Sequence, residues 1–149
     1  MRRREFISLL GGAAVAWPLA AMAQESGKAP SIGYLGTAPA IESKWLVAFV
    51  QRLGELGWVE GRTVVIERRW SGGRPDRVAE VAAEFVVQQK VDVIVTYGGA
   101  VSTFKQATSS IPIVFALAID PLGIGLVTSL SHPGGNVTGL SVQSAESAW

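Results

Sequence analysis

Three short segments carry residue types that suit the binding of a small organic anion or an amino acid. They are Gly36-Thr37-Ala38, Tyr97-Gly98-Gly99-Ala100 and Leu117-Ala118-Ile119-Asp120, and each follows an apolar run typical of a strand. Glycine lets the backbone approach a ligand closely, a hydroxyl such as that of Thr37 can pair with a carboxylate, and Tyr97 offers an aromatic face. These three segments are therefore the candidate ligand loops.

Each candidate also has a purely structural interpretation, which stays open at this point. Gly98 and Gly99 are common in turns, and Tyr97 has the size of a core residue. Asp120 precedes Pro121, where an aspartate commonly caps a helix.

Catalytic, cofactor and nucleic-acid functions have little support in the residues. His132 is the one histidine, it lies among turn residues, and no acidic partner is near it in sequence. The chain has no cysteine, no metal-ligand spacing, no nucleophile elbow and no glycine-rich nucleotide fingerprint. No basic stripe suggests nucleic-acid binding. We expect no enzyme activity and no cofactor, and we expect the acidic side chains to be solvated, namely Glu42, Glu55, Glu60, Glu80 and Glu84.

The elements that must position the loops alternate between strand and helix. Predicted strands cover 31–36, 63–70, 91–96, 111–116 and 137–140, and predicted helices begin near Lys44, Pro75, Ala100 and Pro121. The runs 91–96 and 111–116 are almost continuously apolar, as in central parallel strands covered on both faces. The alternating run 63–70 suits an edge strand. This rhythm predicts an α/β domain, a flavodoxin-like parallel sheet of order 2-1-3-4-5 with helices on both faces.

The first 23 residues are typical of an export signal. Arg3 and Arg4 precede Phe6 and an alanine-rich apolar run, and Ala21-Met22-Ala23 has the small-x-small pattern of a cleavage site. Glycine and proline interrupt the run, which argues against a membrane span. We expect twin-arginine export, cleavage after Ala23 and a periplasmic location. Removing the segment changes 13 basic and 12 acidic residues to 10 and 11, a net charge of −1.

The whole chain resembles the N-terminal half of substrate-binding proteins of ABC transporters, in the family related to tryptophan and tyrosine uptake. Six segments carry the resemblance: 2–12, 55–61 (Glu-Leu-Gly-Trp-Val-Glu-Gly), 91–95, 111–115, 120–121 and 133–139 (Pro-Gly-Gly-Asn-Val-Thr-Gly). The resemblance implies one lobe of a two-lobed clamp and ligand contacts at the three loops. The candidates are Gly36, Thr37, Tyr97, Gly98 and Asp120.

Residues 24–149 are accordingly expected to form the first lobe of a periplasmic-binding-protein-like clamp. The second lobe is expected to be missing, which indicates either a truncated gene product or fragment, or a single lobe with another role. A lone lobe is expected to bind weakly or to pair with a partner. The leading hypothesis is the solute-binding component of an ABC importer, with a membrane permease and the twin-arginine machinery as protein partners. The alternatives are an exported sensor module and an exported enzyme using Asp120 or His132.

Overall fold

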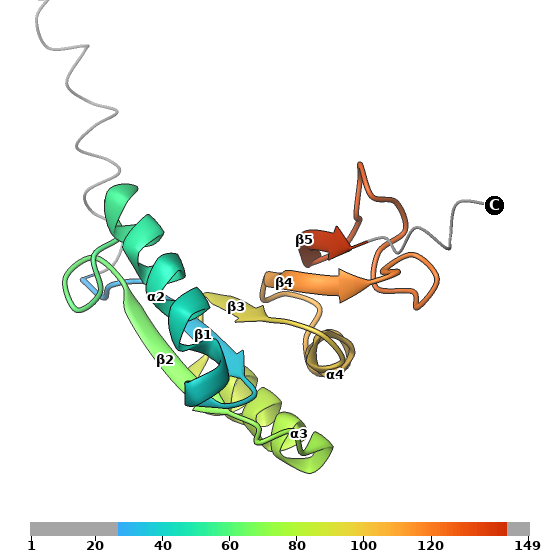
Figure 1. The fold of residues 1–149 in the computed structure, drawn as a ribbon, viewed down its shortest axis with the longest axis horizontal. Coiled ribbons are helices and arrows are strands. Elements are labelled where there is room, and N and C mark those ends of the chain that lie inside the picture. Colours follow the sequence, from blue (N-terminus) through green and yellow to red (C-terminus); the bar gives the residue numbers. More distant parts are fainter. Residues whose placement is uncertain (1–26, 143–149) are drawn as a thin grey trace, which may run out of the picture.

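The computed structural model describes residues 27–142, which form a five-stranded parallel sheet with helices on both sides (Figure 1). The predicted export segment, with Arg3, Arg4, Phe6, Ala21 and Ala23, lies outside the described residues. In chain order the elements are β1 (Ser31–Gly36), α2 (Pro39–Glu55), β2 (Val65–Trp70), α3 (Pro75–Ala83), a π-helical segment η1 (Glu84–Gln89), β3 (Val93–Thr96), α4 (Ala100–Ala107), β4 (Ile113–Ile119) and β5 (Val137–Val142).

The strand order is β2-β1-β3-β4-β5, and every neighbouring pair is parallel. The predicted order and the edge position of β2 are both confirmed. Parallel neighbours need crossover connections, which α2, α3 with η1, and α4 supply between the first four strands. All five strands therefore point their carboxyl ends toward the same edge of the sheet.

Helix α2 covers one face of the β2-β1-β3 half of the sheet. Leu46, Phe49, Val50 and Leu53 recur at helical spacing and pack around Tyr34, Ile66 and Val95. The helix begins earlier than the predicted start at Lys44, because Pro39 provides a favourable first position. Trp45 and Leu56 belong to the same apolar pattern but are 65% and 59% exposed, so the buried stripe of the helix is narrower than its apolar pattern.

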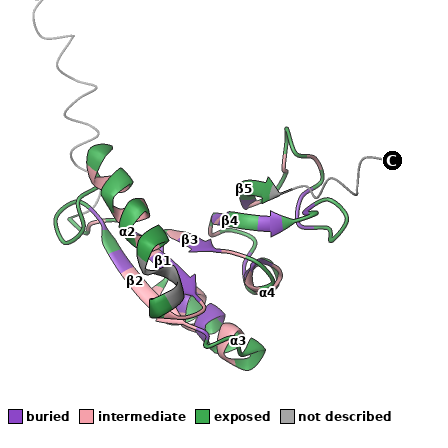
Figure 2. Ribbon diagram, viewed as in Figure 1, coloured by how far each residue is buried: buried purple, intermediate pink, exposed green. Residues whose placement is uncertain are grey.

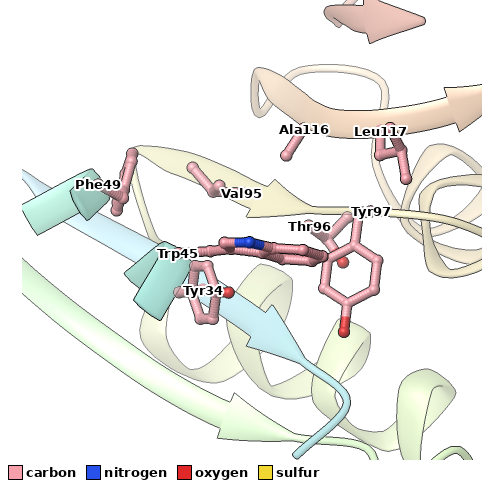
Figure 3. A pocket seen from close by; sticks show the side chains of 8 residues that line it. All are labelled: Tyr34, Trp45, Phe49, Val95, Thr96, Tyr97, Ala116 and Leu117. Atoms are coloured by element: carbon pink, nitrogen blue, oxygen red, sulfur yellow. The ribbon is translucent and has the colours of Figure 1, made fainter. Parts of the chain in front are cut away.

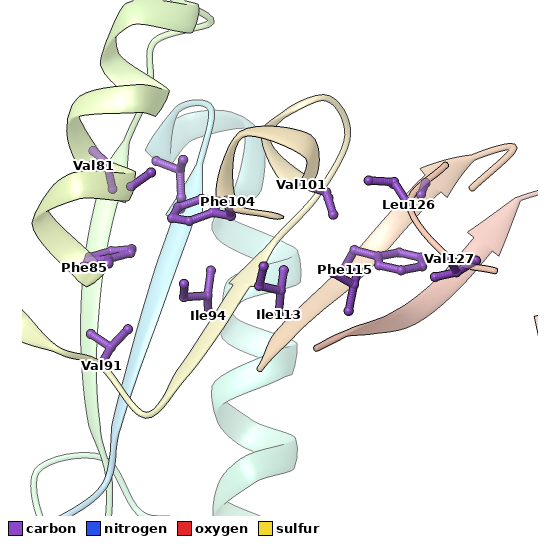
Figure 4. Packing of buried hydrophobic residues seen from close by; sticks show 14 residues of the cluster. Val81, Phe85, Val91, Ile94, Val101, Phe104, Ile113, Phe115, Leu126 and Val127 are labelled. Atoms are coloured by element: carbon purple, nitrogen blue, oxygen red, sulfur yellow. The ribbon is translucent and has the colours of Figure 1, made fainter. Parts of the chain in front are cut away.

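The opposite face holds the larger core, formed by α3, η1 and α4 against the sheet (Figure 4). Phe85 of η1 and Phe104 of α4 are fully buried, and their rings stack with centroids 6.1 Å apart. Beneath them lie Ile94 and Ile113 of the central strands, both 0% exposed. The apolar face of the helix that was predicted to begin near Pro75 therefore covers the sheet.

Two sequence expectations near residue 120 were wrong. Strand β4 continues to Ile119, so residues 117–119 of the predicted third loop lie in the strand and Asp120 alone follows it. The helix predicted from Pro121 does not form, and residues 121–125 make turns instead. Asp120 and Gly125 have φ values of 47° and 69°, which interrupt a right-handed helix.

Strand β4 was also expected to be covered on both faces, and this is not so. On the side of α2, no helix among the described residues lies over β4 and β5, and Ile119 and Leu140 are 70% and 73% exposed (Figure 2). The other face of the same strands is buried, with Val137 at 2% exposure. Within residues 27–142, no helix is long and apolar enough to cross a membrane.

Candidate functional site

The carboxyl ends of β1, β2 and β3 bring three loops together. These loops are residues 37–38, 71–74 and 97–99, and helices α3 and α4 begin directly after the second and third. Neither helix has a side-chain cap at its first turn, so its N-terminal end offers backbone N–H groups and partial positive charge to a ligand.

A pair of hydrogen bonds ties the first loop to the third. The Tyr97 hydroxyl donates to Thr37 Oγ1 over 2.6 Å, and the Thr37 backbone N–H donates to the Tyr97 oxygen over 2.9 Å. The second loop joins the first through the N–H of Gly72, which donates to the Thr37 carbonyl over 2.8 Å. Three loops far apart in the sequence are thus held in one cluster.

A polar pocket of about 330 Å³ opens among these loops. Its polar lining comes from the side chains of Thr37, Ser71, Arg74, Tyr97 and Thr103, together with the backbone at Gly98 and Gly99. Ser71 is only 7% exposed, and its Oγ accepts the N–H of Gly73 over 3.3 Å.

A second, apolar pocket of about 260 Å³ lies on the α2 side of the sheet (Figure 3). Figure 3 shows the rings of Tyr34, Trp45 and Tyr97 around it, with Leu117 of β4 also lining it. Tyr97 lines both pockets. Ligand sites in proteins commonly combine an apolar lining with a few placed polar groups, and the two pockets, which share Tyr97, supply these elements.

Four of the five predicted contact positions come together in this region. Thr37, Tyr97 and Gly98 line the polar pocket, and Gly36 ends β1 beside it, where its carbonyl accepts the N–H of Ser71 over 2.9 Å. Gly98 also performs the turn role considered above, because its φ is 60° and its N–H donates to the Leu117 carbonyl over 2.9 Å.

Asp120 is placed differently from the other four. It lines neither pocket, and its Oδ1 accepts the N–H of Gly123 over 3.0 Å. Its carboxylate therefore closes a turn, which is close to the capping interpretation, although no helix follows. His132 is exposed in the loop before β5, with its Nδ1 3.2 Å from Ser131 Oγ.

Sequence reasoning missed Ser71, Arg74 and the apolar contribution of Trp45. The loop after β2 was not among the three predicted ligand loops, although its strand ends at the same carboxyl edge as the others. The signal was present in the sequence as an arginine directly before Pro75, the expected start of a helix.

Among residues 27–142, no group of three or more His, Asp or Glu side chains is placed to hold a metal ion.

Most of the arginines near the site are hydrogen-bonded to carboxylates. Arg68 donates to Glu60 over 2.8 Å and Arg69 Nε donates to Glu84 over 2.9 Å. The hydrogen bond from Arg69 holds the pKa of the Glu84 carboxyl below its usual value, against the opposing effect of burial. The hydrogen bond from Arg68 lowers the pKa of Glu60 in the same way. Glu60 and Glu84 are therefore ion-paired, not simply solvated as expected.

The sequence matches the model of a protein family described as "ABC transporter substrate binding protein" over residues 43–148. The tyrosine-binding protein of Clostridioides difficile (strain R20291) is 30% identical over 93 residues, which are 62% of this chain and 27% of that protein.

Solved structures give the same fold at similar identity. A Streptococcus pneumonia ABC domain in complex with L-Trp superposes with a TM-score of 0.67 at 30% identity, covering 76% of this chain and 39% of that one. A conserved domain protein of Vibrio cholerae gives a TM-score of 0.71 at 30% identity, covering 79% of this chain and 40% of that one. The chain thus spans about two fifths of these solved structures and about a quarter of the curated relative.

Proposed function

Because the chain belongs to the family of ABC transporter substrate binding proteins, we propose that it is a solute-binding component of an ABC importer that works in the periplasm. It binds a small organic solute at the carboxyl edge of its sheet and passes it to a membrane permease without converting it. The export signal predicted from residues 1–23 favours delivery by the twin-arginine route.

One observation carries this proposal, the position of Tyr97. Tyr97 lines the apolar pocket, its hydroxyl is hydrogen-bonded to Thr37, and the same residue lines the polar pocket. A solute with a carboxylate and an apolar side chain matches such a pair of surfaces. Two relatives bind tyrosine and L-Trp, so aromatic amino acids are the first class to test.

We propose further that residues 24–149 supply one of two lobes that close on the solute. In such a clamp, the solute stabilises the closed form because it contacts both lobes only there. One lobe alone buries one side of the solute, so it binds more weakly than the closed pair. A concave site and solute-binding relatives support binding without catalysis.

A thermal-shift screen tests the function directly. The purified chain is heated with L-tryptophan, L-tyrosine, other amino acids and small organic acids at millimolar concentrations. We expect a concentration-dependent rise in Tm with an aromatic amino acid, because a ligand that binds only the folded state stabilises it. Tyr97→Ala should abolish the rise, whereas the control Trp58→Ala, on the loop after α2, should keep it. The absence of a shift with every probe at ten millimolar would reject the proposal.

A further inference from the structure

Arg74 differs from the other arginines of its region in lacking a close carboxylate partner. Arg68, Arg69 and Arg77 each donate to a glutamate over 2.8 or 2.9 Å. The nearest carboxylate to Arg74 among the described residues is Asp76, with its Oδ2 3.9 Å from Nη1. This separation exceeds the usual hydrogen-bond distance. The Arg74 guanidinium therefore keeps its donors available.

The polar pocket has one charged residue in its lining as the structure describes it, and that residue is Arg74. The other polar groups are the hydroxyls of Thr37, Ser71, Tyr97 and Thr103. No aspartate or glutamate of the described part lines the pocket. A pocket lined by hydroxyl groups and one arginine, with no carboxylate, favours an anionic group over a neutral or cationic one.

We infer that Arg74 is the residue that selects the carboxylate of the solute. Arginine presents planar, paired donors that match a carboxylate, and such charge-assisted hydrogen bonds are the strong ones. The main chain at Arg74 is held at the rim of the pocket, because its N–H donates to the Ser71 carbonyl over 3.1 Å and Pro75 begins α3 immediately afterwards. This inference rests on the proposed function and assigns the charge of the ligand group that enters the polar pocket.

Carboxylate selectivity is measured by comparing two probes that differ only in that group. L-tryptophan carries a carboxylate, and L-tryptophanamide carries a neutral amide in its place. The dissociation constant of each is obtained from a ¹H–¹⁵N NMR titration of the full ¹⁵N-labelled chain, which reaches the millimolar range. For the wild-type chain we expect L-tryptophan to bind about tenfold more tightly than the amide, the low end for charge-assisted hydrogen bonds because Arg74 is 64% exposed.

Variants of Arg74 test whether this residue selects the carboxylate of the ligand or only maintains the structure of the pocket. Arg74→Gln should weaken L-tryptophan about tenfold and leave L-tryptophanamide unchanged, whereas Arg74→Lys should recover part of the difference. Asp76→Asn removes the competing carboxylate at 3.9 Å and should tighten L-tryptophan binding. The matched control is Arg52→Gln, because Arg52 is equally exposed and paired with Glu55 on α2. It should leave both constants unchanged.

The outcomes distinguish this inference from the function on which it rests. If the wild-type chain binds neither probe, the inference about Arg74 and the proposed solute-binding function are both rejected. If it binds L-tryptophan and Arg74→Gln binds it equally well, the inference is overturned and the solute-binding function stands. An equal loss for both probes in Arg74→Gln, or a loss of selectivity in Arg52→Gln, would also overturn it.

Discussion

Gly33 in strand β1 lies directly against the ring of Phe85, and this contact makes a sharp test of the fold. A Cβ atom at position 33 would lie 2.7 Å from Phe85 Cδ2 and 2.8 Å from Cε2. The ring is fully buried and stacked on Phe104 with centroids 6.1 Å apart, so it has little room to move. We predict that Gly33→Ala destabilises the protein.

The magnitude follows from two opposing terms. Adding a methyl group to a well-packed core costs about 1–3 kcal/mol. Replacing glycine within a strand returns about 0.5–1 kcal/mol through backbone entropy. The two terms bracket a net loss in the free energy of unfolding of about 0–2.5 kcal/mol, and the 2.7 Å approach to Phe85 Cδ2 places this substitution in the upper half of that range. Gly54→Ala is the matched control, because Gly54 lies in α2 with no atom within 4 Å of the added Cβ. It should stabilise by up to about 1 kcal/mol.

Urea unfolding followed by circular dichroism measures both variants against the wild-type chain. The two midpoints should move in opposite directions although the chemical change is the same. In the double variant Gly33→Ala with Phe85→Leu, the cost should be smaller than the sum of the two single costs, since the smaller side chain leaves space for the methyl group. A wild-type midpoint for Gly33→Ala, or simple additivity in the double variant, would refute the packing of η1 on β1.

Three further predictions concern charge, exposure and the site. Glu84→Gln should cost about 1 kcal/mol at pH 7, measured by urea unfolding across pH. Arg69 lowers the pKa of the folded Glu84 carboxyl. The difference in the free energy of unfolding between the wild-type chain and the variant should therefore be complete above the usual carboxyl pKa and vanish as the pH falls through the folded pKa. A difference independent of pH would contradict this prediction. Leu140→Lys should change stability by less than about 0.5 kcal/mol because Leu140 is 73% exposed, whereas Val137→Ala, at 2% exposure, should cost about 2 kcal/mol in the same assay. Tyr97→Phe removes the hydroxyl that joins two loops and should weaken L-tryptophan binding several-fold in an NMR titration while the chain stays folded; unchanged binding would exclude the hydroxyl from the site.

The sheet was predictable because the sequences of its strands are apolar runs bounded by turn residues. Residues 31–36 match β1 residue for residue, and the alternation of strand and helix fixed the order of the five strands. Pro112 has no N–H to donate within a sheet, which suits the start of a strand, and β4 begins at the next residue. These features depend on local pattern and on general rules of chain connection.

The parts that sequence reasoning missed depend on tertiary contacts. Residues 117–119 were assigned to a loop because the preceding strand was predicted to end at 116. In the structure, the pairing of Ala118 and Ile119 with β5 extends the strand. In the sequence, Arg74 is one of four arginines between residues 68 and 77. Only the structure separates the three paired arginines from the one that lines the pocket, since that distinction rests on which glutamates the fold brings near.

A crystal structure of the chain grown with millimolar L-tryptophan tests the central claim most directly. The account predicts that the ligand lies at the carboxyl edge of the sheet, with its carboxylate in the polar pocket near Arg74 and its indole against Tyr97. A ligand bound elsewhere on the lobe, such as at the loop before β5, or no ligand in crystals whose polar pocket is open to solvent, would contradict it.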